Sequence, residues 1–278
     1  MRIKSLFDRC RVDGSKAFVA YIAAGDPTFE KSLKIVDVLV EAGIDILELG
    51  VPFSDPLADG EANQLAAVRA LNSGMTPERV LDLSCEIRKR HPNLPLVLFT
   101  YINPIAYSSE INFAIFCKKA VEVGIDAFLP LDLPPEERDR EWRESETYND
   151  TISRAELPLV TLIAPTTTSK RIPLLTSTAN SFIYYVSKEG VTGEGSSFSA
   201  GFADKIAQIR ESTDLPIVVG FGISTPAHVK AAISTGVDGV VVGSAIVRKV
   251  EEFAEGRASL DEIRQFVSSM TEASKSTI

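Results

Sequence analysis

The chain has few of the residues on which metal-dependent and nucleophilic catalysis usually relies. Its 278 residues include only two histidines and three cysteines. Cys10, Cys85 and Cys117 are far apart and form no Cys-x-x-Cys pair, so we expect neither a zinc site nor a disulfide framework. Unpaired cysteines fit a reducing compartment, and we expect a cytoplasmic location. If the chain is an enzyme, its tools are expected to be carboxylates and backbone amides, without a bound metal.

An excess of positive charge and long apolar runs are also missing. The chain has 29 Lys and Arg against 38 Asp and Glu, a net charge of −9, which argues against non-specific binding to nucleic acid. No apolar run approaches the roughly 20 residues that span a bilayer. The charged, amphipathic segment 1–11 does not resemble a signal peptide. We therefore expect neither nucleic acid nor a membrane as a partner.

What the sequence does contain is a regular alternation of short apolar runs and amphipathic segments. The runs have the length and the near-continuous apolarity of strands buried on both faces of a parallel sheet. They cover residues 17–23, 46–50, 95–100, 127–131, 159–164, 182–186, 217–220 and 239–243. The amphipathic segments predict helices over 28–42, 76–90, 110–123, 136–146, 169–177, 200–211, 225–235 and 259–271.

One short phrase recurs before three of the runs. It reads Glu-Ala-Gly-Ile-Asp at 41–45, Glu-Val-Gly-Ile-Asp at 122–126 and Ser-Thr-Gly-Val-Asp at 234–238. In each copy we expect the glycine to end a helix and the aspartate to open the next strand. The repeat, with no break in composition, predicts one α/β domain over 1–278, a single (β/α)8 TIM barrel. A doubly wound open sheet is the alternative, although no Gly-x-Gly-x-x-Gly opens the first turn.

Two segments do not belong to a minimal barrel. Residues 1–11 are expected to form a helix that caps the bottom of the barrel. Residues 138–156 are highly charged and long for one crossover helix, so we expect a solvated extension. Its Trp142 and Tyr148 are expected to pack locally rather than bind a ligand.

One carboxylate lies in the second apolar run and another in the loop after it, at the end of the barrel where active sites lie. Side chains alternate along a strand, so Glu48 is expected to face the barrel mouth, where burial raises its pKa towards that of a general acid or base. A structural salt bridge is the alternative. Asp59 lies in the loop 51–62, which we expect to be mobile and to carry this carboxylate over the mouth. A local turn role is the alternative for Asp59.

Glycine-rich segments follow three later runs. The segment 188–198, which contains Gly193, is expected to be a mobile lid, with a disordered linker as the alternative. Gly222, Gly243 and Ser244 follow the last two runs, and a short helix is expected to begin at the last of them. Backbone N–H groups there are expected to bind a phosphate, with tight turns as the alternative.

The string Leu-Glu-Leu-Gly-Val-Pro-Phe-Ser-Asp-Pro-Leu-Ala-Asp-Gly at 47–60 closely resembles the signature of the tryptophan synthase alpha chain family. Further matching stretches lie in order at 25–27, 132–137, 187–193, 220–224 and 243–247, so that the resemblance spans nearly the whole chain. It implies a TIM barrel that cleaves indole-3-glycerol phosphate to indole and glyceraldehyde 3-phosphate. It also implies a beta chain partner in an alpha2beta2 heterotetramer, in which the beta chain uses pyridoxal phosphate and this chain uses no cofactor.

The same resemblance implies roles for individual residues. Glu48 would be the general acid/base, Asp59 the second catalytic carboxylate and Tyr184 an active-site tyrosine. The implied phosphate-binding residues are Gly193, Gly222, Gly243 and Ser244, and those lining the indole pocket are Tyr21, Phe99 and Leu129. The beta chain is expected to dock on the loop 52–60 and the segment 101–104, with contacts at Pro52, Asp55, Tyr101 and Asn103.

Three functions remain open at this point. The chain is the alpha subunit of a bifunctional complex, a stand-alone lyase, or a non-catalytic activator of the beta chain, and retention of both carboxylates argues against the last. The sequence departs from the family pattern at Glu61, where proline is usual, at Asn63, where an apolar residue is usual, and at Ala67, often polar. We expect Glu61 to raise the pKa of Asp59.

Overall fold

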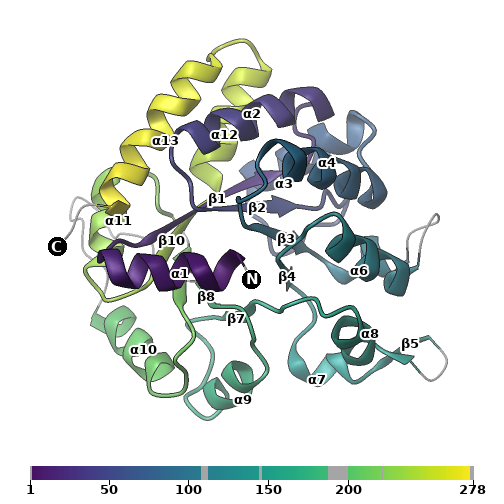
Figure 1. The fold of residues 1–278 in the computed structure, drawn as a ribbon, viewed down its shortest axis with the longest axis vertical. Coiled ribbons are helices and arrows are strands. Elements are labelled where there is room, and N and C mark those ends of the chain that lie inside the picture. Colours follow the sequence, from purple (N-terminus) through teal and green to yellow (C-terminus); the bar gives the residue numbers. More distant parts are fainter. Residues whose placement is uncertain (1, 108–111, 144–145, 187–199, 221, 276–278) are drawn as a thin grey trace.

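The computed structural model describes residues 2–107, 112–143, 146–186, 200–220 and 222–275. Eight parallel strands form a barrel in the order β4-β3-β2-β1-β10-β9-β8-β7 (Figure 1). Their bounds are β1 Ala17–Ala23, β2 Ile46–Gly50, β3 Leu96–Thr100, β4 Ala127–Pro130, β7 Thr161–Ile163, β8 Ile183–Val186, β9 Ile217–Gly220 and β10 Gly239–Val242. The ring closes between β4 and β7, where the N–H of Val160 donates to the carbonyl of Phe128 over 2.9 Å. The prediction of a barrel is confirmed, and the open sheet is excluded.

Helices cover the outside of the barrel and also lie at its two ends (Figure 1). They are α1 Arg2–Asp13, α2 Phe29–Glu41, α3 Glu61–Asn72, α4 Pro77–Arg90, α5 Ile102–Ala106, α6 Phe113–Glu122, α7 Pro135–Arg138, α8 Tyr148–Arg154, α9 Ile172–Ser177, α10 Ala200–Arg210, α11 Pro226–Ile233, α12 Ser244–Ala254 and α13 Leu260–Lys275. Thr76 and Thr225 cap α4 and α11 by accepting an N–H three residues on, each followed by a proline. Helices α3, α5 and α8 were not predicted from the sequence.

Alternation along each strand divides the core in two. Leu47 and Leu49 of β2 face outward and pack with helix residues such as Leu39. Ile46 faces inward and packs with inward residues of other strands, including Val19. Because odd and even positions face opposite layers, Glu48 shares the inward face with Ile46.

The recurring phrase has a structural role at the N-terminal end of the barrel. The glycines take the left-handed conformation predicted for a helix end, with φ of +86° at Gly43, +91° at Gly124 and +85° at Gly236. Each aspartate also accepts a hydrogen bond from the neighbouring strand. The N–H of Phe18 donates to Asp45 over 2.8 Å, that of Leu96 to Asp126 over 2.9 Å, and that of Ile217 to Asp238 over 2.8 Å.

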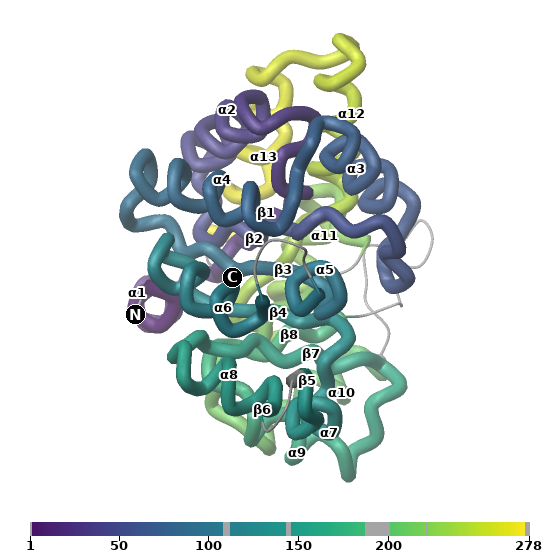
Figure 2. The backbone as a smooth tube through the Cα atoms, turned by 90° about the vertical axis from the view of Figure 1, so that its right-hand side faces the viewer, coloured from purple at the N-terminus to yellow at the C-terminus, as the bar shows by residue number. Residues whose placement is uncertain are grey.

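Helix α1 closes one end of the barrel, as predicted. Its buried residues Ile3, Leu6, Phe7 and Cys10 belong to the same cluster as the inward strand residues. The rings of Phe7 and Phe182 are 5.9 Å apart. Figure 2 shows α1 at one end of the barrel and α5 at the opposite end. The open end is therefore the one at which the strands finish.

The charged segment 138–156 differs in part from what the sequence predicts. The predicted helix 136–146 is wrong, because α7 stops at Arg138 and an antiparallel hairpin follows, formed by β5 (Glu141–Arg143) and β6 (Glu146–Thr147). The predicted solvated extension describes only part of the segment, because Asp139, Arg140, Asp150 and Arg154 are exposed whereas Tyr148, Thr151 and Ile152 are buried. Trp142 and Tyr148 pack their rings against Phe113 of α6, at 5.6 and 5.2 Å, as local packing predicts. Although most of the segment is charged, the contacts of Trp142 and Tyr148 with Phe113 hold α8 in the helix layer.

Within the described ranges, every helix is too short or too polar to span a bilayer.

Candidate active site

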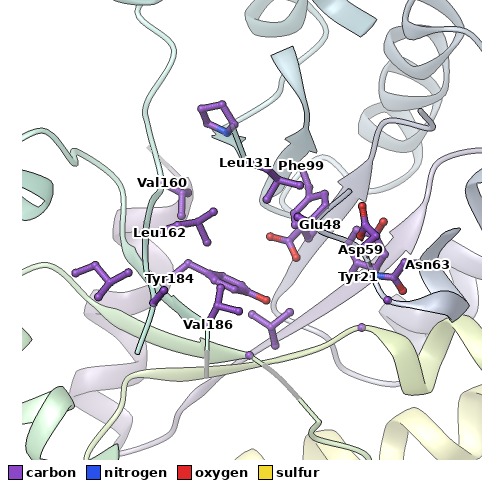
Figure 3. A pocket seen from close by; sticks show the side chains of 18 of the residues that line it. Tyr21, Glu48, Asp59, Asn63, Phe99, Leu131, Val160, Leu162, Tyr184 and Val186 are labelled. Atoms are coloured by element: carbon purple, nitrogen blue, oxygen red, sulfur yellow. Dashed lines mark hydrogen bonds between the residues drawn. The ribbon is translucent and has the colours of Figure 1, made fainter. Parts of the chain in front are cut away.

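A cavity of about 1110 Å³ opens where the barrel strands end. Side chains from several strands and from α3 and α12 converge on it (Figure 3). Its lining includes Tyr21, Glu48, Asp59, Asn63, Phe99, Leu131, Val160, Leu162, Tyr184, Val186, Gly222, Gly243, Ser244 and Arg248. Most of the sequence-predicted site residues within the described ranges therefore meet at one place.

Glu48 lies at the centre of the cavity wall and is almost completely buried, with 1% of its surface exposed. Its Oε1 atom has no hydrogen-bond partner among the described residues. Burial, together with the negative charge of Asp59, raises the pKa of Glu48 to about 8. The alternative, a structural salt bridge of Glu48, is not found among the described residues, and the carboxyl group is suited to gain and lose a proton near neutral pH.

Asp59 approaches the cavity from the loop between β2 and α3. The hydroxyl of Tyr101 donates to its Oδ2 over 2.8 Å, and Nδ2 of Asn63 donates to its Oδ1 over 3.3 Å. Burial raises the pKa of Asp59, while these two hydrogen bonds lower it. Glu61 is not a cause of the shift, so the effect expected of Glu61 is wrong. The arrangement gives Asp59 a defined position inside the cavity.

Three aromatic side chains form walls around the two carboxylates (Figure 3). The rings of Tyr21 and Phe99 meet edge to face, with centroids 5.0 Å apart. Tyr184 stands on β8, across the cavity. Burial first, and then the negative charges of Glu48 and Asp59, raise the pKa of Tyr21 and of Tyr184 well above the ordinary tyrosine value. Both hydroxyls therefore remain protonated and can donate.

Leu129 is not part of the cavity wall. It is fully buried among the inward residues of the barrel, in register with Phe99 on the neighbouring strand. Inward positions on this chain segment are every second residue, so the next one, Leu131, reaches the cavity instead. Leu129, which the resemblance implies for the indole pocket, therefore lies deeper in the barrel than the cavity, by one inward-facing residue.

The opposite side of the cavity is rich in backbone N–H groups. Gly222 has a backbone φ of +64°, which residues other than glycine rarely adopt. Gly243 and Ser244 stand at the start of α12, an 11-residue helix and so longer than expected. Helix N-termini attract anions, and Arg248, one turn into the same helix, also lines the cavity. Gly193 and the segment 188–198 lie outside the described residues.

The four residues expected to contact a partner differ in exposure. Asp55 and Asn103 are exposed, whereas Pro52 and Tyr101 are buried. The ring of Tyr101 packs against Phe53 at 5.4 Å, and its hydroxyl accepts the N–H of Ala58 over 2.9 Å. Tyr101 therefore ties the loop that carries Asp59 to the end of β3.

Sequence reasoning missed the positions of Asn63 and Arg248 in the cavity and the hydrogen bond from Tyr101 to Asp59. One signal for Asn63 was available, because it comes only four residues after Asp59, in the first turn of the helix that follows it. A comparable signal existed for Arg248, an arginine in the first turns of a helix, where the helix dipole disfavours a cation. Nothing in the sequence joins Tyr101 to Asp59, which is 42 residues away.

In the part of the chain that the structure describes, no three His, Cys, Asp or Glu side chains gather in a way that could hold a metal ion.

Comparisons with known proteins agree in what they find. A family model described as tryptophan synthase alpha chain matches residues 7–275. The chain is 43% identical over 251 residues to the tryptophan synthase alpha chain of Opitutus terrae, covering 90% of each. It is 41% identical over 274 residues to that of Desulfatibacillum aliphaticivorans, covering 98% of each. The crystal structure of tryptophan synthase subunit alpha from Legionella pneumophila matches with a TM-score of 0.85 and 32% identity, over 98% of this chain and 97% of that one.

Proposed function

The chain belongs to the tryptophan synthase alpha chain family, and we propose that Glu48 and Asp59 are the two carboxylates with which it performs the family's reaction. As a member it is a lyase that cleaves indole-3-glycerol phosphate to indole and glyceraldehyde 3-phosphate in tryptophan biosynthesis. The observation that carries the proposal is the buried carboxyl group of Glu48, whose Oε1 is unpartnered among the described residues and whose pKa lies at about 8.

Glu48 carries both proton transfers. Indole C3 gains a proton, the hydroxyl on the adjacent carbon loses one, and the electron pair of the breaking carbon–carbon bond returns to the ring as the aldehyde forms. With a pKa of about 8, Glu48 holds a proton at neutral pH and gives it to C3. The carboxylate so formed takes the hydroxyl proton, which restores the starting state.

Asp59 stabilises the ring while C3 is protonated. Positive charge then develops at the ring nitrogen, and an ionised carboxylate accepts its N–H in a charge-assisted hydrogen bond. The donors Tyr101 and Asn63 favour this ionised form of Asp59. The two carboxylates thus have different roles: burial favours the protonated form of Glu48, and two hydrogen bonds favour the charged form of Asp59 against the effect of its burial.

The remaining residues bind the two ends of the substrate. Tyr21 and Phe99 pack against the indole ring, with Leu131 in the place expected of Leu129. The hydroxyl of Tyr184 faces the reacting groups. Gly222, Gly243 and Ser244 hold the phosphate through backbone N–H groups, together with Gly193 from outside the described range.

A beta chain is the proposed partner, in an alpha2beta2 heterotetramer in which the beta chain holds pyridoxal phosphate. The face around Asp55 and Asn103 is the proposed docking surface, and it includes Leu57, which is 85% exposed, and Tyr107, which is 66% exposed. We further propose that the whole chain is one domain, that its loop 51–62 moves during turnover, and that it works in the cytoplasm. The segment 188–198 lies outside the described residues.

The decisive experiment is a cleavage assay on Glu48→Gln. We expect turnover of indole-3-glycerol phosphate to fall at least about 100-fold, while binding of glycerol 3-phosphate, a phosphate probe without a ring, stays unchanged. Glu61→Gln, which removes an exposed carboxyl group at the rim of the same cavity, is the matched control. Near-normal turnover by Glu48→Gln overturns the assignment. Repeating the assay with and without a beta chain shows whether cleavage depends on the partner.

A further inference from the structure

Asn63 is a polar residue of the cavity to which the family resemblance gives no part in the reaction. It lies in the first turn of α3, four residues after Asp59 and beside it in the cavity (Figure 3). Its Nδ2 is 3.3 Å from Oδ1 of Asp59. Its own Oδ1 is buried and has no hydrogen-bond partner among the residues that the structure describes. The amide N–H of Asn63 thus donates to Asp59, while its carbonyl oxygen accepts no hydrogen bond from the described residues.

The orientation of this amide follows from the chemistry of its neighbour. Turning the amide over would place its oxygen against a carboxylate oxygen, and two acceptors repel each other. The orientation with the N–H towards Asp59 is therefore favoured. It leaves a buried carbonyl oxygen unpaired, which destabilises a folded protein. An apolar side chain of the same size would suit the fold better, so stability alone does not explain an asparagine here.

Asn63 and Tyr101 hold the two oxygens of one carboxylate from different elements. Tyr101, at the start of α5, donates to Oδ2, and Asn63, on α3, donates to Oδ1. Donors on both oxygens fix the rotation of the carboxylate plane and favour its charged form. The hydrogen bond from Asn63 lowers the pKa of Asp59 against the effect of burial.

We propose that Asn63 is a positioning residue, whose amide N–H keeps Asp59 ionised and aimed at the ring nitrogen of the substrate. The proposal rests on the proposed function, in which Asp59 accepts that N–H. The other titratable or charged groups that line the same cavity are Tyr21 on β1, Glu48 on β2, Tyr184 on β8, Glu61 on α3, Arg138 on α7, Arg171 before α9 and Arg248 on α12, and Tyr101 after β3 contacts Asp59 directly. None of them is changed in the test below, so a shift in the pH profile reports on Asp59.

The test is the pH dependence of kcat/KM for cleavage, which reports groups of the free enzyme. Activity requires ionised Asp59, so it falls as the pH drops through the pKa of Asp59. Asn63→Leu, close in size but without the donor, is expected to move this acid limb up by about one pH unit and to lower activity on the limb about tenfold. Its Tm is expected to stay the same or to rise. Asn63→Asp, which puts a second carboxylate beside the first, is expected to move the limb further.

The matched control is the neighbouring residue on the same helix. Nε2 of Gln64 donates to the backbone oxygen of Asp59 over 2.8 Å but does not contact its carboxylate, and Gln64 is exposed. Gln64→Leu is expected to leave the acid limb in place. The proposal is overturned if Asn63→Leu lowers the Tm and leaves the limb unmoved, because the side chain is then only structural.

Asp59→Asn separates this proposal from the function on which it rests. If Asp59→Asn keeps near-normal turnover, the role of Asp59 itself is wrong. If Asp59→Asn is inactive and Asn63→Leu leaves the acid limb unmoved, only the role of Asn63 is wrong.

Discussion

The hydroxyl of Tyr184 occupies the space that a side chain on Gly220 would need. A β-carbon on Gly220 would overlap that hydroxyl and lie 2.9 Å from Cζ of the same ring. Tyr21 and Gly50 have the same relationship on the other side of the barrel, where the added carbon would lie 2.8 Å from Cζ. The two tyrosines that flank the carboxylates thus depend on glycines at the ends of β9 and β2.

Gly220→Ala is therefore expected to displace Tyr184 and to lower kcat/KM for cleavage roughly tenfold, as misplaced groups at a reacting centre do. In a Tyr184→Phe background, which lacks the hydroxyl, the same change is expected to have a smaller effect. A double-mutant cycle on kcat/KM measures this coupling. Additive effects would mean that the glycine serves another purpose.

The free energy of unfolding is expected to depend on pH because of Glu48. Burial raises the pKa of Glu48 from 4.5 to about 8. Between these two pH values the folded protein keeps the Glu48 proton, whereas the unfolded chain loses it. Unfolding is therefore favoured as the pH rises through this window, by a few kcal/mol in all. Chemical denaturation at several pH values should show Glu48→Gln gaining stability over the unmodified protein from about pH 4.5 to about pH 8.

Glu61→Gln is the control for this measurement, because Glu61 is an exposed carboxyl group of the same cavity. A stability difference for Glu48→Gln that does not change with pH would contradict the raised pKa.

Arg248 is expected to contribute to phosphate binding but not to bond cleavage. It lines the cavity one turn after Ser244, and a guanidinium group binds phosphate oxygens through charge-assisted hydrogen bonds. Arg248→Gln should weaken binding of glycerol 3-phosphate about tenfold, near 1.4 kcal/mol, with little change in kcat. Lys249→Gln makes the same change in charge at a residue paired with Glu252 over 2.7 Å. Equal weakening in both variants would show that only long-range charge matters.

An ion pair between Asp26 and Arg69 joins the end of β1 to α3. The guanidinium Nε and Nη2 atoms donate to the two carboxylate oxygens over 2.8 and 2.9 Å, and Asp26 is 2% exposed. Arg69→Met leaves a buried carboxylate unpaired and should lower the free energy of unfolding by about 3 kcal/mol. Asp26→Asn, added to that variant, should restore part of the loss in chemical denaturation. A double variant no more stable than the single one would show that the charge of Asp26 is not the cause.

The sequence by itself determined the barrel and the direction in which Glu48 points. Apolar runs mark strands, and the period of two along a strand places Glu48 on the inward face whatever lies around it. The glycine and aspartate of the recurring phrase are likewise local signals, and the structure confirms the helix ends they predict. Where local signals are diluted by charge, as in 138–156, the sequence misled, because a few aromatic anchors outweigh many solvated side chains.

Only the tertiary structure decided what surrounds the carboxylates. The contact of Tyr101 with Asp59, the replacement of Leu129 by Leu131 at the wall, and the burial that raises the pKa of Glu48 to about 8 all arise when distant strands close into a ring. Burial and hydrogen bonding depend on which side chains come into contact across the barrel, and no local sequence pattern predicts those contacts. The small numbers of histidines and cysteines pointed to carboxylate chemistry, but closure of the barrel is what gives two similar carboxyl groups different environments.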